Sequence, residues 1–155
     1  MNLENRIVFI TGASSGIGEA CARAFAARGA RLVLVARRTE RLNALASELG
    51  VEVWTLALDV QDADAVAWAV DSLPDDWAEI DVLVNNAGLG RGLDKLHEGT
   101  IDDWEQMIDT NVKGLLYVTR AVVPGMVDRG RGHVVNIGSV AGHEVYPGGN
   151  VYCAT

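Results

Sequence analysis

TGASSGIG, at residues 11–18, is the stretch of this sequence that decides the fold. It follows a nearly continuous run of apolar and β-branched residues at 6–11, which is typical of a buried strand. It opens a segment at residues 16–28 in which apolar residues recur with the period of a helix. The glycines therefore form the turn between a strand and a helix, and this is the context that a dinucleotide-binding turn requires.

Each glycine of the stretch has a physical role in such a turn. Gly12 allows the tight turn out of the strand, Gly16 lets phosphates approach the backbone, and Gly18 lets the helix pack closely on the strand. The unpaired N–H groups and the dipole at the start of a helix favour negative charge. We therefore expect the pyrophosphate of a dinucleotide to lie at this helix.

The rest of the chain alternates in the same way between strands and helices. The expected strands lie at residues 6–11, 31–36, 51–58, 81–85 and 132–138, and the expected helices at 16–28, 39–49, 62–73 and 101–129. Strands separated by helices of this length pair in parallel through right-handed crossovers, with helices on both faces. The sequence predicts an α/β fold, a Rossmann-type doubly wound parallel sheet in a single domain over residues 1–155.

Two of the expected helices carry patterns that predict how they pack. The inward face of helix 16–28 is expected to consist of Ile17, Ala20, Cys21, Ala24 and Phe25. Helix 101–129 starts at the N-cap Thr100 and is apolar on more than one face, so we expect its second face to meet another helix, for example in a partner subunit. Pro124 is expected to bend it. The tryptophans are expected in the core or between helix and sheet: Trp54, Trp68, Trp77 and Trp104.

Composition and charge exclude several classes of protein. With 13 Lys and Arg against 21 Asp and Glu, the formal net charge of −8 argues against nucleic acid as the main partner. No apolar run reaches the roughly 20 residues that span a bilayer, and no signal peptide is expected at the start. The two cysteines suggest no disulfide framework, so we expect a reduced, cytoplasmic setting. The three histidines lack metal-ligand spacing, so no catalytic metal is expected.

The end of the second expected strand predicts which dinucleotide is bound. An acidic residue there would hydrogen-bond a ribose 2′-hydroxyl, whereas an arginine accommodates a 2′-phosphate. This sequence has no acid at that place and has two arginines, Arg37 and Arg38. Guanidinium groups suit phosphate, so the pattern favours NADP over NAD, with Arg37 as the main contact and Arg38 as a second. The alternative is that both are solvated residues at the start of a helix.

Several motifs together resemble the short-chain dehydrogenase/reductase family. They are TGASSGIG at 11–18, Asp59-Val60, Asn85-Asn86-Ala87-Gly88, Asn111, Ser139 and Tyr152, in the order of the family along the whole chain. Within the family, residues 72–90, 102–115 and 147–155 look most like the NADP-dependent 3-hydroxy acid dehydrogenases, which act on serine, allo-threonine and related acids. The resemblance implies hydride transfer between NADP and a small 3-hydroxy acid or related alcohol, by a homo-oligomer that is a tetramer or a dimer.

The resemblance also implies a role for each of these residues. The cofactor would be held by the glycine turn, the two arginines and residues at the ends of later strands: Gly12, Ser14, Ser15, Gly16, Ile17, Gly18, Arg37, Arg38, Asp59, Val60, Asn86, Ala87 and Gly88. Asp59 would bind the adenine amine, with Val60 beside the ring. Tyr152 would be the general acid/base, Ser139 would hydrogen-bond the substrate oxygen, and Asn111 would hold a water through its main-chain carbonyl in a proton relay.

The chain departs from the family pattern at its end. In the family a lysine follows the tyrosine by four residues and lowers its pKa, but this chain stops at Thr155, one position earlier. The C-terminal strands of the sheet, and the helix that Tyr152 should begin, are then expected to be missing from this chain. A phenol with a pKa of about 10 is a poor base at neutral pH. We therefore expect the 155-residue piece alone to be inactive.

Other functions stay open from the sequence. A 3-oxoacyl carrier-protein reductase or another carbonyl reductase of the family would carry the same motifs, as would an NADP-binding regulatory protein that has lost catalysis, and the piece could also be purely structural. Two loop residues are further candidates for substrate contact. Arg91 could meet a substrate carboxylate and His143 could touch the substrate, although a solvated loop residue is the alternative for each.

Overall fold

The computed structural model describes residues 2–155, and this part of the chain contains one parallel sheet of five strands. The strands are β1 (Ile7–Thr11), β2 (Arg31–Ala36), β3 (Val53–Ala57), β4 (Ile80–Asn85) and β5 (His133–Asn136). Their order in the sheet is β3-β2-β1-β4-β5, which confirms the predicted doubly wound arrangement. The strand order reverses between β1 and β4, so a ligand is expected at the carboxyl ends of these two strands.

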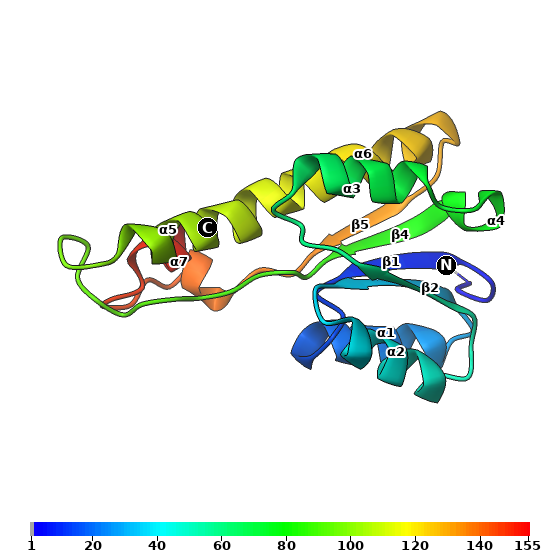
Figure 1. Ribbon diagram of the computed structural model, residues 1–155, viewed down its shortest axis with the longest axis horizontal. Helices are drawn as coiled ribbons and strands as arrows, with labels where there is room; N and C mark the ends of the chain where they lie inside the picture. The colour runs from blue at the N-terminus through cyan, green and yellow to red at the C-terminus, as the bar shows by residue number, and fades with distance from the viewer. Residues whose placement is uncertain (1) are drawn as a thin grey trace.

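Helices cover both faces of the sheet (Figure 1). α1 (Gly16–Ala26) and α2 (Thr39–Glu48) lie on one face, and α3 (Ala63–Asp71) and α6 (Leu115–Asp128) lie on the other. The other helical segments are short: α4 (Asp75–Ala78), α5 (Ile101–Met107), η1 (Ile108–Gly114), η2 (Val140–Gly142) and α7 (Asn150–Ala154). α5 and α7 lie together on an arm that extends beyond the carboxyl ends of the strands, at the left of Figure 1.

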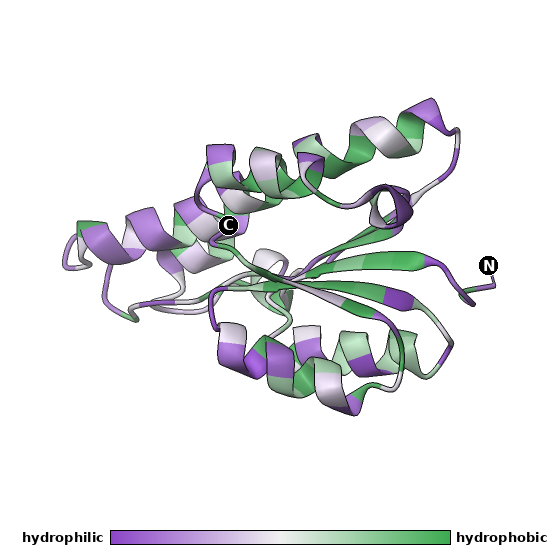
Figure 2. Cartoon of the chain, turned by 45° about the vertical axis from the view of Figure 1, so that its right-hand side comes forward, coloured by the Kyte–Doolittle hydropathy of each residue, from purple (hydrophilic) through white to green (hydrophobic). Residues whose placement is uncertain are grey.

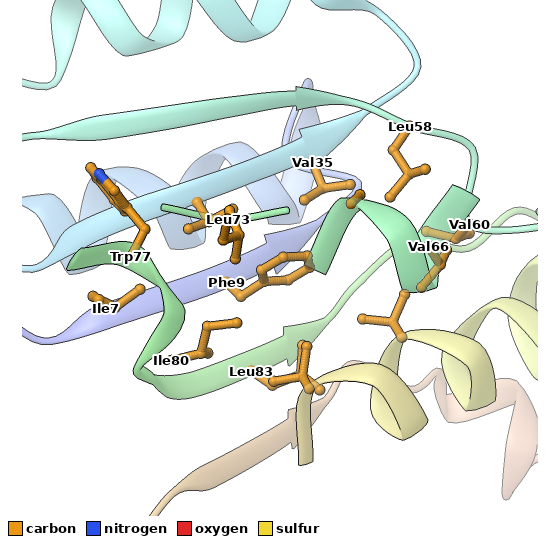
Figure 3. Close-up of a cluster of buried hydrophobic side chains, with 14 of the residues drawn as sticks. Ile7, Phe9, Val35, Leu58, Val60, Val66, Leu73, Trp77, Ile80 and Leu83 are labelled. Atoms are coloured by element: carbon orange, nitrogen blue, oxygen red, sulfur yellow. The ribbon is translucent and has the colours of Figure 1, made fainter. Parts of the chain in front are cut away.

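The residues of β1 alternate between two hydrophobic clusters, one on each face of the sheet. Ile7 and Phe9 belong to the cluster with α3 and α6, whereas Val8 and Ile10 belong to the cluster with α1 and α2. Phe9 is completely buried, and Figure 3 shows it at the centre of the first cluster. Because the strands are covered on both faces, their sequences are almost continuously apolar, as Figure 2 shows.

The inward face of α1 differs from the predicted one. The buried residues are Gly18, Ala22 and Ala26. Of the residues expected to point inward, Ile17, Ala20 and Ala24 are exposed, whereas Cys21 and Phe25 are partly buried against the cluster with α1 and α2. The start of α1 lies so close to the turn that a Cβ on Gly18 would come within 2.4 Å of the carbonyl oxygen of Gly12. This close approach selects the stripe with the smallest side chains, which a pattern of hydrophobicity alone does not identify.

The helix expected over residues 101–129 is present, but it is not uniform. α5 continues through η1, a π-helical segment, into α6, which ends at Asp128 and contains Pro124. A π turn holds more residues than an α turn, so it shifts the stripe that faces the sheet. Ile108, at the start of η1, is 40% exposed, whereas Gly114, at its end, is buried against Val60. The second apolar face of this helix is exposed along α6 at Leu116 and Val127.

Two other expectations are corrected. Trp68 is 72% exposed and Trp54 is partly exposed on the edge strand β3, so neither lies in the core. Trp77 is buried, and the guanidinium of Arg31 lies 4.2 Å from its ring centroid. The helix around Tyr152 is also present in the chain, because α7 begins at Asn150, two residues before the tyrosine.

Candidate active site

A cavity of about 980 Å³ lies at the carboxyl ends of the strands, where the strand order reverses. It brings together most of the residues that the sequence singled out: Gly12, Ser14, Ser15, Ile17, Arg37, Arg38, Asp59, Val60, Asn86, Ala87, Gly88, Asn111, Ser139 and Tyr152. Gly16 and Gly18 do not line it. His143 lines this cavity, but Arg91 lines a separate, smaller hollow beside it.

The glycine turn is tied to the end of β4 through Thr11. The Thr11 hydroxyl oxygen accepts hydrogen bonds from the backbone N–H groups of Asn86 and Ala87, both at 3.0 Å. In return, the side-chain amide of Asn86 donates to the carbonyl oxygens of Thr11 (2.9 Å) and Gly12 (3.2 Å). Gly12 has φ +66°, and a Cβ there would meet the Asn86 amide nitrogen at 2.8 Å. Sequence reasoning missed Thr11, although it is the last residue of β1 and almost fully buried.

The start of α1 has the properties of a phosphate site. Ser15 is the N-cap of α1, but its side chain makes no capping hydrogen bond. Because the side chain leaves the first-turn N–H groups uncapped, they can bind an anion. Gly16, with φ +61°, has no heavy atom within 4 Å of the position that a Cβ would occupy. The residues of this turn therefore fit a pyrophosphate.

The two arginines after β2 have different surroundings. The guanidinium of Arg38 donates to the Ser14 hydroxyl at 2.9 and 3.2 Å and to the Ser15 hydroxyl at 2.7 Å, and these serines belong to the glycine turn. Arg37 is 66% exposed in its side chain and lies 3.6 Å from a carboxylate oxygen of Asp59. The structure thus links Arg38, which was expected to be the second contact to the 2′-phosphate, to the glycine turn by hydrogen bonds.

Asn111 lies in η1 and holds the segment that follows β4. Its amide group donates to the carbonyl oxygen of Leu89 and accepts from the N–H of Leu89, both at 2.9 Å, and it also donates to the Thr155 hydroxyl at 2.9 Å. This side-chain role comes in addition to the main-chain role that the resemblance implies. Lys113 of the same segment donates to Asp109 at 2.7 Å, and this hydrogen bond raises the pKa of Lys113.

Ser139 and Tyr152 reach the cavity from opposite ends of one loop. Ser139 follows β5, and its oxygen accepts a hydrogen bond from the N–H of Ala141 at 3.2 Å, so its hydroxyl proton stays free to be donated. Tyr152 is on α7, and its ring lies against Gly90, where a Cβ would be 3.3 Å from the ring. The arrangement can present a hydroxyl donor and a phenol to the same small molecule.

The smaller hollow, of only about 10 Å³, shares Tyr152 with the main cavity. It is lined by that tyrosine together with Arg91, Asp103 and Trp104. The guanidinium of Arg91 lies 3.6 Å from Asp103, and the backbone N–H of Arg91 donates to the sulfur of Met107 at 3.4 Å.

Within residues 2–155, no three or more His, Cys, Asp or Glu side chains are grouped so that they could hold a metal ion. None of the helices in this range has the length and apolarity needed to cross a membrane.

Comparison with known proteins gives consistent results. The family model described as short chain dehydrogenase matches residues 6–155. NADP-dependent 3-hydroxy acid dehydrogenase YdfG of Salmonella typhi is 56% identical over 149 residues, which are 96% of this chain and 60% of that protein. Sulfoacetaldehyde reductase 2 of Chromohalobacter salexigens is 49% identical over 152 residues, with 96% and 60% covered.

Among solved structures, the closed form of a serine dehydrogenase complexed with NADP+ superposes with a TM-score of 0.93 at 51% identity. The match covers 96% of this chain and 60% of that one. The chain thus spans about 60% of the length of the curated relatives it matches.

Proposed function

The chain belongs to the short-chain dehydrogenase family, and from this premise we propose that the protein carrying it is an NADP-dependent oxidoreductase. It would transfer a hydride between the nicotinamide and a small 3-hydroxy acid or a related alcohol or carbonyl compound. The observation that supports this best is that one cavity is lined both by the glycine turn, to which Arg38 is hydrogen-bonded, and by Ser139 and Tyr152. We propose that residues 1–155 act as one nucleotide-binding domain.

In this proposal the cofactor is held by groups that the fold has already positioned. The uncapped N–H groups at the start of α1 would bind the pyrophosphate. Arg38, held by Ser14 and Ser15, would bind the 2′-phosphate, with Arg37 beside it. Asp59 and Val60 would contact the adenine, and Asn86, Ala87 and Gly88 would line the ribose: all are on the cavity wall.

The chemistry at the substrate carbon would need few protein groups. The bound cofactor supplies the nicotinamide ring, which accepts the hydride in oxidation and returns it in reduction. Tyr152 would take the proton of the substrate hydroxyl in oxidation and return it in reduction. The Ser139 hydroxyl would donate a hydrogen bond to the substrate oxygen as it becomes a carbonyl. Asn111 would keep the wall of the site in place through Leu89 and would carry a water of the proton relay.

A second reaction within the same function is the reduction of a small aldehyde. The resemblance to a sulfoacetaldehyde reductase favours it, and the same residues would run the steps in reverse. A carrier-protein substrate would instead require a basic docking surface beside the site, and the presence of Ser139 and Tyr152 weighs against a purely regulatory role.

We also propose that the protein forms homo-oligomers and works in the cytoplasm. The exposed apolar residues of α6, including Leu116 and Val127, provide a face that another helix could cover. The two cysteines, Cys21 and Cys153, are unpaired, which fits a reducing compartment.

Steady-state kinetics on the complete protein test the proposed function. With 3-hydroxypropanoate or L-serine as substrate, we expect turnover with NADP+ at a kcat/KM at least about tenfold above that with NAD+, as expected for one charge-assisted phosphate site. Tyr152→Phe should abolish turnover and leave NADP+ binding within about threefold, because the phenol handles protons and does not hold the cofactor. Absence of turnover with every hydroxy acid and aldehyde, despite NADP+ binding, would favour the regulatory alternative.

A further inference from the structure

We infer that Arg91 binds the anionic group of the substrate and thereby selects small carboxylates or sulfonates over uncharged alcohols. This inference rests on the proposed function, because it concerns how a substrate is oriented beside Tyr152. Both named relatives act on small molecules that carry an acid group, a 3-hydroxy acid in one case and sulfoacetaldehyde in the other. A guanidinium near the reacting carbon would favour such molecules over uncharged alcohols.

The backbone that carries Arg91 is fixed on both sides. Leu89 is held by two hydrogen bonds to the Asn111 side chain, each 2.9 Å long, and the Arg91 N–H is held by the sulfur of the buried Met107. Gly90, between them, lies directly against the ring of Tyr152. The backbone of Arg91 is therefore held in place, and it follows directly on Gly90, the residue that contacts the ring of the proposed general acid/base Tyr152.

The same loop is also tied to the helix that carries Tyr152. The side-chain amide of Asn150, at the start of α7, donates to the carbonyl oxygen of Asp94 at 2.6 Å. A Cβ on Gly148 would come within 2.4 Å of the carbonyl oxygen of Leu93, so the two segments are in close contact. The distance between the Arg91 loop and Tyr152 is thus set by the packing of the protein and does not depend on a mobile loop.

The charge of Arg91 is only loosely paired. Its guanidinium lies 3.6 Å from Asp103, beyond hydrogen-bonding distance, and its side chain is 49% exposed. By comparison, Arg23 and Arg131 each approach a glutamate to 2.7 Å. Among the arginines of residues 2–155 that contact a carboxylate, only Arg37 has an equally long shortest distance, 3.6 Å. Arg37 lines the main cavity beside the proposed 2′-phosphate site.

Position distinguishes Arg91 from the other cations near the cavity. Arg37 and Arg38 line the end with the glycine turn, whereas Arg91 shares the smaller hollow with Tyr152. His143 lines the main cavity, but an imidazole is charged only when protonated, while a guanidinium stays charged and can bind a carboxylate through two parallel hydrogen bonds. Tyr152 lines both spaces, so in this inference the exposed and loosely paired Arg91 side chain turns from Asp103 toward the acid group of a substrate bound at Tyr152.

The test compares a charged substrate with an uncharged one of the same shape in the complete protein. For 3-hydroxypropanoate, Arg91→Gln should lower kcat/KM at least about tenfold, mainly through KM, because a charge-assisted pair is lost. For 3-hydroxypropanamide, the same substitution should change kcat/KM by less than about threefold, because the amide carries no charge. Arg91→Lys should recover part of the loss for the carboxylate, since it keeps the charge and loses the fork.

Two variants separate substrate binding from a structural role of the pair with Asp103. If Arg91 only clamps α5, Asp103→Asn will reproduce the effect of Arg91→Gln, and the inference fails. If Arg91 binds the substrate, Asp103→Asn will leave the KM for the carboxylate unchanged or lower it. Arg28 is an exposed arginine just after α1, and Arg28→Gln should leave kcat/KM unchanged for both substrates. Equal losses for carboxylate and amide in Arg91→Gln would overturn the inference, whereas no turnover by the wild type would instead count against the proposed function.

Discussion

At the residue scale, the cofactor end of the cavity depends on two neighbouring arginines that the fold treats differently. Arg38 is pinned to Ser14 and Ser15 by hydrogen bonds of 2.7–3.2 Å, so its guanidinium is already oriented beside the glycine turn. Arg37 is exposed and only loosely paired with Asp59. A pre-oriented guanidinium loses less freedom when it binds phosphate, so Arg38 should contribute more to NADP selectivity.

Substitution of each arginine tests this order. Arg38→Gln should raise the KM for NADPH by about tenfold or more, as expected for one charge-assisted contact, and should leave the KM for NADH within about twofold. Arg37→Gln should have the smaller effect on NADPH. Initial rates measured with NADPH and with NADH give the KM of each variant for each cofactor. If Arg37→Gln raised the KM for NADPH more than Arg38→Gln did, Arg37 would be the main contact for the 2′-phosphate.

A second prediction at this scale concerns the close approach at Gly18. A Cβ there would lie 2.4 Å from a backbone oxygen of Gly12, which cannot move without deforming the turn. Gly18→Ala should therefore weaken NADP+ binding at least about tenfold, because pyrophosphate binding depends on this geometry. Isothermal titration calorimetry measures the loss.

Gly50→Ala is the matched control for Gly18→Ala. Gly50 has φ +64° and open space around it, so the alanine should cost about 1 kcal/mol of folding free energy and leave NADP+ binding unchanged. If both variants lost affinity equally, the effect at Gly18 would come from general destabilisation.

The sequence predicted the residues of the site better than their contacts. The glycine spacing and the Asn-Asn-Ala-Gly segment can be recognised in a sequence because few residue types can replace them in a dinucleotide site. The structure places most of these residues on the wall of one cavity. Thr11 left no such signal, because a threonine at a strand end is common, and only the fold shows that its hydroxyl accepts from Asn86 and Ala87. The order of Arg37 and Arg38 likewise depends on side-chain directions that a sequence does not contain.

At the scale of the elements, η1 links the long helix to the loop after β4. Asn111 is the contact, since its side chain makes both hydrogen bonds to Leu89. Asn111→Ala should therefore loosen residues 89–95 and raise their amide exchange rates at least about tenfold, because a net loss of two hydrogen bonds lowers the local opening free energy by about 1–3 kcal/mol. Hydrogen–deuterium exchange with mass spectrometry measures this.

Asn43→Ala serves as the control for Asn111→Ala. Asn43 accepts a hydrogen bond from Thr55 on the opposite side of the sheet from the long helix, so its loss should leave exchange in residues 89–95 unchanged. If Asn111→Ala had no local effect, the loop would be held by Met107 and Asn150 alone.

Elements were predicted well in kind and order but less well in detail. All five strands and the main helices were predicted. The strands are visible as apolar runs because both of their faces are buried, and the helices are visible because apolar residues recur with the helical period. The π turn at η1 could not be predicted, because the hydrophobic pattern of the sequence does not distinguish a π turn from an α turn within a long helix. The inward face of α1 was only partly right, because Cys21 and Phe25 flank the core while its centre is formed by the small residues Gly18, Ala22 and Ala26.

At the scale of the whole molecule, stability depends on the two clusters that cover the faces of the sheet. Phe9 is fully buried in the cluster with α3 and α6. Phe9→Ala should reduce the free energy of unfolding by about 3–5 kcal/mol, through lost burial and the cavity left behind. Trp68→Ala, at a residue that is 72% exposed, should change it by no more than about 0.5 kcal/mol. Urea denaturation monitored by circular dichroism compares the two variants with the wild type.

The contrast between Phe9 and Trp68 shows the limit of residue type as a guide to the core. The four tryptophans were all expected in the core or between helix and sheet, yet position in the fold decides burial: Phe9 is on the central strand, whereas Trp68 is on the outer side of α3. If the two variants lost equal stability, the exposed tryptophan would have to be covered in solution by another surface.

The position of Trp104 in the small hollow has a practical consequence. Trp104 lines this hollow together with Arg91 and Tyr152, so its fluorescence quantum yield should respond when Arg91 turns to bind an acid group. Trp54, Trp68 and Trp77 are the other tryptophans of residues 1–155, and their replacement by phenylalanine would leave Trp104 as the one tryptophan of this part of the protein. Titration of the NADP+ complex with malonate should then shift its emission, and Arg91→Gln in that background should abolish the shift, which would make substrate-side occupancy visible without any turnover.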